Sequence, residues 1–139
     1  MRALIIYSAS GRLDPLVTGL KQGLESVDIN VQLQEADRSQ SQPIAVSQYD
    51  LIFVGSPIVG VFGGKIAEDV QNMLTHVSRM EGKRCIAFVK PLLFGTGKGL
   101  RTLMSAMEKQ GAIVVDFASL TSPREAQQLG KRAKKVLPQ

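Results

Sequence analysis

Apolar runs of strand length alternate with helical patterns along this chain, and no other feature of the sequence constrains its fold as strongly. Several of the runs are continuously apolar rather than alternating, which is typical of strands that are covered on both faces of a parallel sheet. Five strands are predicted, over residues 2–7, 31–35, 51–55, 85–89 and 113–117.

Between these runs, apolar residues recur every three or four positions, as they do on one face of an amphipathic helix. Asp14 before Pro15, and Ser122 before Pro123, are expected to cap the first and last helices, with proline in the first helical position. The polar segment 37–48 has no clear period and is predicted to be a loop or one short helix. Helices are predicted over residues 13–24, 66–77, 100–107 and 126–136.

This order of elements predicts an α/β fold: a doubly wound, five-stranded parallel sheet with helices on both faces. With 139 residues, 44% of them hydrophobic, the chain is expected to form a single domain over residues 1–139. Ligands of such sheets bind beyond the carboxyl ends of the strands, near the switch in strand order. A site is therefore expected in the loops after the first, third and fourth strands.

Residue usage argues against several classes of site. Cys85 is the one cysteine of the sequence, so an internal disulfide and a cysteine-ligated zinc or iron–sulfur centre are excluded, and its apolar neighbours predict a buried strand thiol. His76 is the one histidine and is expected to be a surface or groove residue. The N-terminal apolar run is too short for a secretion signal or for a membrane span, so a cytoplasmic protein is expected.

The chain is basic, with a net charge of +5. A positive charge near the end of a helix is favourable with the helix dipole, so the basic tail is expected to be a solvated helix end, with a docking patch for an acidic partner as the alternative. Specific nucleic-acid binding is not expected, because no basic stripe is interleaved with aromatic residues. The charges of the tail are Lys131, Arg132, Lys134 and Lys135.

The loop after the first strand combines small hydroxyl residues with one glycine. Backbone N–H groups, two hydroxyls and the start of the following helix could together bind a phosphate there. An ordinary strand-to-helix turn, in which the serines satisfy local backbone groups, is the alternative. The residues of this loop are Ser8, Ala9, Ser10, Gly11, Arg12 and Leu13.

Two further glycine-rich loops follow the third and fourth strands, over residues 55–64 and 90–99. The first is long and apolar, so it could form the wall for a flat ligand or could cover the sheet edge. The second contains GTGKG, but Leu92 stands where a nucleoside-triphosphate loop needs glycine, and no Ser or Thr follows Lys98. What remains there is Phe94 beside glycines whose backbone could face a planar ligand.

The three loops together resemble the flavodoxin family, electron carriers that bind flavin mononucleotide (FMN) non-covalently. The resemblance implies that the first loop binds the FMN phosphate, with Ser8, Ser10 and Gly11 matching the family pattern and Leu13 lacking its last hydroxyl. It covers nearly the whole chain and is carried by RALIIYSASG, YDLIFVGSPIVGVFGG, GKRCIAFVKPLLFGTGKGLRTLMSAMEKQGA and IVVDFASLTSPREAQQLGKRAKKV.

The resemblance also implies that the later loops enclose the flavin ring. Val59 stands where the family commonly has an aromatic residue, whereas Phe94 matches an aromatic followed by Gly-x-Gly, and Gly60 is the candidate for a backbone contact to flavin N5. The ring contacts are expected from Ser56, Pro57, Ile58, Val59, Gly60, Phe94, Gly95, Thr96 and Gly97.

Flavodoxins are typically acidic, and this chain is not. Arg12 and Lys98 are expected to stabilise the phosphate and an anionic reduced flavin, which implies a higher potential than usual. The expected function is electron transfer between redox partner proteins, for which an acidic partner surface would suit the positive chain. The alternatives are an FMN-dependent NAD(P)H reductase or flavin domain of a larger oxidoreductase, and an interaction module that has lost FMN.

Overall fold

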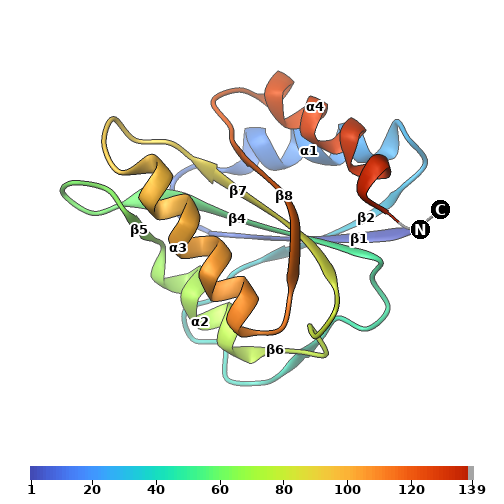
Figure 1. Cartoon of the computed structure of the whole chain (residues 1–139), viewed down its shortest axis with the longest axis horizontal. Coiled ribbons are helices and arrows are strands. Elements are labelled where there is room, and N and C mark those ends of the chain that lie inside the picture. The colour runs from blue at the N-terminus through green and yellow to red at the C-terminus, as the bar shows by residue number, and fades with distance from the viewer. Residues whose placement is uncertain (138–139) are drawn as a thin grey trace.

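The computed structural model describes residues 1–137 and consists of a parallel sheet between two layers of helices (Figure 1). The strand order across the sheet is β2 (Asn30–Glu35), β1 (Arg2–Tyr7), β4 (Leu51–Val59), β7 (Arg84–Lys90) and β8 (Ile113–Ser119). All four neighbouring pairs are parallel. The predicted doubly wound, five-stranded α/β sheet is thus confirmed.

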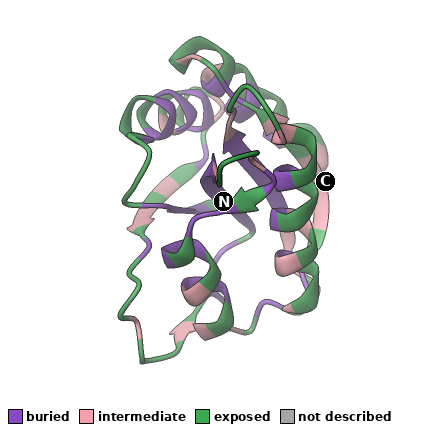
Figure 2. Ribbon diagram, turned by 90° about the vertical axis from the view of Figure 1, so that its left-hand side faces the viewer, coloured by how far each residue is buried: buried purple, intermediate pink, exposed green. Residues whose placement is uncertain are grey.

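The helices cover the two faces of the sheet in pairs (Figures 1 and 2). Successive side chains of a strand point to opposite faces, so each strand packs against both pairs. In β1, Ile5 packs on the face covered by the first pair, and Ile6 packs on the face covered by the second. The pairs are α1 (Asp14–Glu25) with α4 (Pro123–Arg132), and α2 (Glu68–His76) with α3 (Thr96–Lys109). Both predicted layers are present, and each encloses its own hydrophobic core.

Helices α1 and α4 approach each other closely because α1 presents glycines to α4. A Cβ on Gly19 would lie 2.4 Å from the carbonyl oxygen of Pro123, and one on Gly23 would lie 2.2 Å from that of Gln127. Neither position has room for a larger residue. This face of the sheet is therefore closed by two helices in backbone contact.

One predicted helix cap is confirmed and the other is wrong. The Ser122 hydroxyl accepts a 3.2 Å hydrogen bond from the backbone N–H of Glu125, as expected of an N-cap. Asp14, in contrast, is the first residue of α1, and Leu13 precedes it without a capping hydrogen bond from its side chain. The buried Leu13 takes the N-cap position, so the helix starts at Asp14, one residue earlier than a cap at Asp14 would give.

The segments between the main strands differ from prediction in three places. Strand β4 continues to Val59 and forms a hairpin with β5 (Lys65–Ile66), so much of the predicted loop over 55–64 is strand. The segment 37–48 contains no helix but a short strand, β3 (Ile44–Ala45), paired with β6 (Val77–Ser78). Helix α3 begins at Thr96, earlier than its apolar pattern suggests, because the glycine-rich sequence 97–99 is helical.

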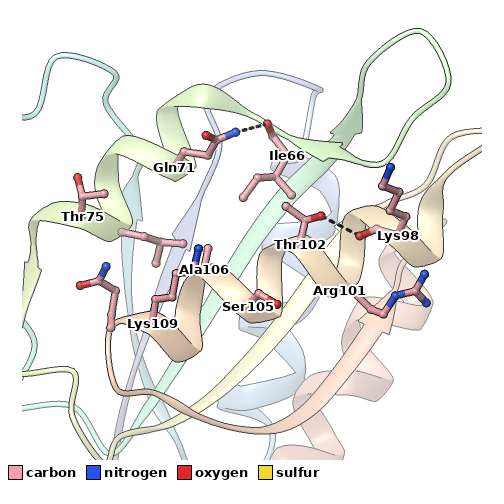
Figure 3. A pocket seen from close by; sticks show the side chains of 11 residues that line it. Ile66, Gln71, Thr75, Lys98, Arg101, Thr102, Ser105, Ala106 and Lys109 are labelled. Carbon is pink, nitrogen blue, oxygen red and sulfur yellow. Dashed lines mark hydrogen bonds between the residues drawn. The ribbon is translucent and has the colours of Figure 1, made fainter.

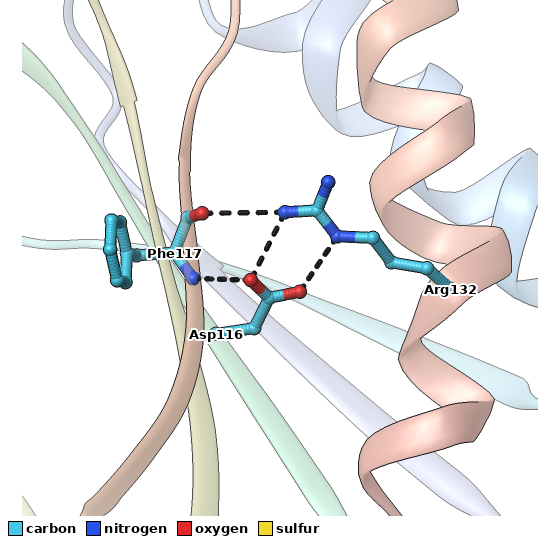
Figure 4. Close-up of polar contacts among 3 residues, drawn as sticks. All are labelled: Asp116, Phe117 and Arg132. Atoms are coloured by element: carbon cyan, nitrogen blue, oxygen red, sulfur yellow. Dashed lines mark hydrogen bonds and ion pairs between the residues drawn. The ribbon is translucent and has the colours of Figure 1, made fainter.

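The four basic side chains at the end of the chain are exposed, as expected for a solvated helix end. Helix α4 ends at Arg132 and is followed by a 3₁₀ turn over Ala133–Val136. Arg132 is paired with the edge strand: its Nε donates to Asp116 Oδ2 at 2.7 Å and its Nη2 to Asp116 Oδ1 at 3.0 Å (Figure 4). This bidentate pair joins α4 to β8, and the Arg132 side chain remains 47% exposed.

Two expectations about single residues and one about membranes can be compared with the structure. Cys85 is fully buried in β7, as predicted, and burial raises the pKa of its thiol to about 12. His76 is half-buried at the end of α2, where its Nδ1 lies 2.9 Å from the carbonyl oxygen of Asn72. Among the helices of residues 1–137, none combines the length and apolar character that a bilayer crossing requires.

Candidate functional site

The loops that follow β1, β4 and β7 meet at the carboxyl edge of the sheet. Gly11 of the first loop lies against Pro57 of β4, so closely that an added Cβ would be 2.5 Å from the proline Cβ. The Nζ of Lys90, at the end of β7, donates a 2.9 Å hydrogen bond to the carbonyl oxygen of Gly11. The structure thus places the three predicted loops side by side.

The second half of the first loop is open to an anion. Gly11 and Arg12 both have positive φ values, +79° and +54°. Within residues 1–137, the N–H groups of Gly11, Arg12 and Leu13 donate to no protein acceptor. They directly precede the N-terminus of α1, whose dipole favours a negative charge. This half of the loop therefore has the donors of an anion site.

The first half of the loop is already occupied by a carboxylate. Asp69, near the start of α2, is only 6% exposed. The Ser8 hydroxyl donates to its Oδ1 at 2.8 Å and lies 3.0 Å from its Oδ2, and the Ala9 N–H donates to Oδ2 at 2.8 Å. The Ser8 oxygen in turn accepts from the N–H of Ser10 at 3.1 Å. Neither donor of Ser8 and Ala9 is free for a ligand.

Two predicted site residues in β4 have structural contacts instead of open faces. The Ser56 side chain is fully buried, accepts a 2.9 Å hydrogen bond from the N–H of Ala67 and donates one of 2.8 Å to the carbonyl oxygen of Pro57. Ile58 is 2% exposed and packs in the core below α3. Both side chains fix the β4–β5 hairpin, whereas Val59 remains half-exposed.

A cavity of about 300 Å³ lies between the first loop and the ends of β4 and β7. A second one, of about 650 Å³, lies on the side of Asp69 and Lys65. Ser10 and Val59 line both of them. The smaller cavity is lined by Ser10, Gly11, Pro57, Ile58, Val59, Lys90, Pro91 and Leu92.

The hairpin after β4 and the loop after β7 are joined to each other through their backbones. The N–H of Gly64 donates a 3.1 Å hydrogen bond to the carbonyl oxygen of Gly95. A Cβ on Gly63 would lie 1.8 Å from the carbonyl oxygen of Phe94, so only glycine allows this contact. Thr96 closes the loop by donating from Oγ1 to the carbonyl oxygen of Leu92 at 2.9 Å. The candidate residue Gly97 lies in the first turn of α3 and is exposed.

These joined loops carry an exposed apolar surface, which we call the apolar tip. Large hydrophobic side chains are usually buried, yet Val61 is 92% exposed and Phe94 is 64% exposed. Gly60, with a φ of +102°, begins the turn of the hairpin. Contiguous exposed apolar residues commonly mark a binding surface. The apolar tip consists of Val61, Phe62, Leu92, Leu93 and Phe94.

A basic groove of about 590 Å³ lies between α2 and α3 (Figure 3). Lys98, Arg101 and Lys109 line it from α3, and no acidic residue is among its lining residues. Lys98 connects the groove to the apolar tip, because its aliphatic chain lies against Gly64. The sequence analysis did not identify this groove, since its residues come from two helices whose pairing is not visible locally.

Sequence reasoning also missed two residues of the loop cluster. Lys90 is the last residue of the buried strand β7, at the edge where ligands bind, and this position could have marked it. Asp69 has no comparable signal, because its partner Ser8 lies 61 positions earlier in the chain. Residues 1–137 contain no group of three or more His, Cys, Asp and Glu side chains placed to bind an ion.

Comparisons with known proteins agree with the fold. The family models searched include none that matches this sequence, and no significant match was found among curated proteins. Solved structures do match over nearly the whole chain. Flavodoxin 1 from Bacillus cereus is 19% identical, with a TM-score of 0.77 and coverage of 99% of this chain and 100% of its own.

Two other structures show the same relationship. The two-electron reduced flavodoxin of Megasphaera elsdenii is 18% identical, with a TM-score of 0.74 and coverage of 98% of this chain and 100% of its own. A flavodoxin, WrbA-like protein from Agrobacterium tumefaciens is 14% identical, with a TM-score of 0.70 and coverage of 97% and 96%. At such identities the likeness concerns architecture, and this chain has the flavodoxin fold.

Proposed function

We propose that this chain binds FMN at the carboxyl edge of its sheet and carries electrons between redox partner proteins. One observation carries the proposal: three unpaired N–H groups, on Gly11, Arg12 and Leu13, lie in the same loop cluster as the exposed apolar tip. FMN has this pair of properties, an anionic phosphate and a flat aromatic ring. The flavodoxins that share the fold support the same assignment.

The phosphate end of FMN fits the second half of the first loop. The free N–H groups there can donate to phosphate oxygens, and the start of α1 contributes the positive end of its dipole. Arg12 is exposed beside them, and Lys90 adds a second positive charge. The Ser10 hydroxyl lies 2.8 Å from the Ser8 oxygen and donates to it, because the Ser8 proton is given to Asp69. The first half of the loop fits less well, because Ser8 and Ala9 donate to Asp69.

The ring end fits the surface between β4 and the loop after β7. Val59 and Leu92 provide aliphatic contacts at the smaller cavity, and Phe94 is the aromatic residue of the adjoining loop. Aromatic contacts contribute on the order of 1 kcal/mol beyond the burial of area. Gly60 precedes Val61 in the hairpin turn, where a glycine backbone can reorient toward a ring nitrogen. One aromatic contact rather than two implies modest ring affinity.

Bound FMN would supply the redox chemistry, and the residues of this chain bind it and adjust its charge balance. Arg12 and Lys90 place positive charge near the first loop, and Lys98 does so beside the apolar tip. Positive charge favours an anionic reduced flavin over the neutral oxidised form. The reduction potential is therefore expected to be less negative than in a flavodoxin with an acidic rim.

The surface next to the apolar tip favours an acidic partner. The three basic residues of the groove form a stripe along α3, which we call the basic stripe and which begins at the apolar tip. It consists of Lys98, Arg101 and Lys109. Opposite charges raise association rates at low ionic strength and lose this effect as salt is added. An acidic redox protein is thus the partner that this surface suits, and electron-transfer rates with it are expected to fall with rising salt concentration.

The test is to saturate the purified protein with FMN, remove free flavin by desalting, and measure retained flavin absorbance and fluorescence quenching. Retention of FMN by the folded protein is the expected result. Failure to retain any FMN at micromolar protein contradicts the proposal. Consumption of NADH or NADPH by the FMN-loaded protein alone would identify a reductase instead of a carrier.

A second function, an interaction module without flavin, is favoured by one specific observation. Asp69 occupies donors of Ser8 and Ala9 that a phosphate would otherwise use. Under this alternative the apolar tip and the basic stripe form a protein-binding surface only. The same desalting experiment separates the two functions, because a module of this kind would retain neither FMN nor riboflavin.

A further inference from the structure

We propose that Asp69 is an internal competitor of the flavin phosphate, so that this chain binds flavin chiefly through the ring and distinguishes FMN only weakly from riboflavin. The inference rests on the proposed function and concerns the selectivity of the same site. It assigns to one buried carboxylate of α2 a role in ligand choice. Its consequence is that a single substitution should convert the site into a selective phosphate binder.

The contacts of Asp69 place its charge on the first loop. Both of its oxygens accept from that loop, through the hydroxyl of Ser8 and the N–H of Ala9. Among residues 1–137, no Lys, Arg or His nitrogen lies within 4.0 Å of its carboxylate, so no ion pair neutralises it. A buried carboxylate of this kind depends on hydrogen-bond donors for its stability. The donors that it uses belong to the loop that would bind phosphate.

A phosphate in this loop would meet Asp69 in two ways. The Ser8 and Ala9 donors are used by Asp69 and those of Ser10 by the Ser8 oxygen, so the phosphate can gain only the N–H groups of Gly11, Arg12 and Leu13. The phosphate dianion would also lie near a carboxylate that is 6% exposed, where water screens the repulsion poorly. Both effects weaken the phosphate contact and leave the ring contact unchanged, because ring-binding residues are on other loops.

A structural role for Asp69 in the first loop predicts the opposite change in FMN affinity. If its carboxylate serves to hold the loop in a phosphate-binding shape, its removal should weaken FMN binding. The hydrogen bond from the N–H of Ser10 to the Ser8 oxygen is a local contact that can keep this shape without Asp69. The two roles are therefore distinguished by the direction in which FMN affinity changes when the charge is removed.

The experiment compares Asp69→Asn with the matched control Glu68→Gln. Both variants remove one negative charge from the first turn of α2 by an isosteric change. Glu68 is a suitable control, because its side chain is 80% exposed and contacts only Arg38 among the charged residues described. Asparagine with its oxygen in the place of Oδ2 can still accept from the N–H of Ala9, and its NH2 group in the place of Oδ1 can donate to the Ser8 oxygen. Dissociation constants for FMN and riboflavin are measured by fluorescence titration at one ionic strength.

The wild-type protein is expected to bind FMN and riboflavin with affinities within about threefold of each other. Asp69→Asn should tighten FMN binding by about tenfold or more and leave riboflavin binding nearly unchanged. Glu68→Gln should leave the ratio of the two affinities unchanged. An equal or lower FMN affinity in Asp69→Asn than in Glu68→Gln would overturn the inference, even if both flavins bind.

Two further results keep the outcomes distinct. Thermal unfolding of each variant shows whether it is folded. If Asp69→Asn does not fold, Asp69→Ser takes its place, because it also removes the charge and retains a hydroxyl acceptor. Binding of neither FMN nor riboflavin to any folded variant overturns the proposed function, and this inference with it. Binding of both with an unchanged ratio in the Asp69 variants overturns this inference alone.

Discussion

The Nζ of Lys90 donates a 2.9 Å hydrogen bond to the carbonyl oxygen of Gly11, so the end of β7 is tied to the loop after β1. The lysine is half-buried at the carboxyl edge of the sheet. It therefore combines two roles in one side chain: it fixes the loop, and it brings a positive charge to the cluster of loops.

Lys90→Met should weaken FMN binding, because methionine keeps the aliphatic chain but loses the charge and the hydrogen bond to Gly11. A hydrogen bond to a charged group contributes roughly 1.5–3 kcal/mol. Because Lys90 is partly exposed, the lower end of this range applies, and FMN affinity should fall about tenfold. Titration with FMN and riboflavin measures it, and FMN should lose more. Lys131→Met, on exposed α4, is the control; equal losses in both variants would contradict the prediction.

Gly11→Ala should destabilise the fold through sterics as well as backbone strain. Its φ of +79° is unfavourable for alanine, and the added Cβ would lie 2.5 Å from Pro57 Cβ. Gly82 is the matched control, because its φ is +75° but nothing lies within 4 Å of an added Cβ. Urea unfolding should show a loss of about 1 kcal/mol for Gly82→Ala and clearly more, at least about 2 kcal/mol, for Gly11→Ala.

Phe94→Ala should weaken FMN and riboflavin equally, because the side chain belongs to the apolar tip and not to the phosphate-binding loop. A loss of roughly tenfold is expected from the area of one aromatic ring face. Its free energy of unfolding should change little, since Phe94 is 64% exposed. Phe117 is similarly exposed, at 54%, but lies on edge strand β8, so Phe117→Ala should leave flavin binding unchanged. A selective loss of FMN affinity in Phe94→Ala would refute this role.

The buried thiol of Cys85 predicts a specific loss of stability in alkali. Burial raises its pKa from an ordinary 9.0 to about 12, so the folded protein retains a proton that the unfolded chain releases above pH 9. The free energy of unfolding should therefore decrease as pH rises from 9 toward 12, by up to about 1.4 kcal/mol per pH unit. Cys85→Ala should lack this part of the slope in urea unfolding measured across that range. Identical slopes in the two proteins would contradict the assignment.

The sheet and its two helical layers could be predicted from the sequence because their signals are local and strong. Continuous apolar runs such as that of β7 indicate double burial, and Ser122 before Pro123 marks a helix start that the structure confirms. The extension of β4 to Val59 was not predictable in this way, because it depends on pairing with β5 and not on the composition of the segment. Asp14 shows that a good capping residue does not cap when the neighbouring Leu13 is required in the core.

For the site, the sequence predicts the location at the sheet edge, but it does not predict which hydrogen bonds the individual residues make. The carboxyl edge of a doubly wound sheet brings the three loops together whatever their exact residues. Which hydroxyls are free is decided by partners distant in the chain, and Ser8, paired with Asp69 across 61 positions, is the clearest case. Ser56 was expected in the site because its segment was predicted to be a loop. In the structure β4 includes this residue, and its buried side chain forms hydrogen bonds with Ala67 and Pro57.

The backbone hydrogen bond from Gly64 to Gly95 couples the lengths of the two loops that form the apolar tip. A residue inserted into either loop would shift its glycine away from the partner glycine, and substitution at Gly63 would collide with the backbone of Phe94. Length changes in one loop are thus tolerated only with a matching change in the other. In relatives of this chain, the lengths of these two loops should accordingly change together.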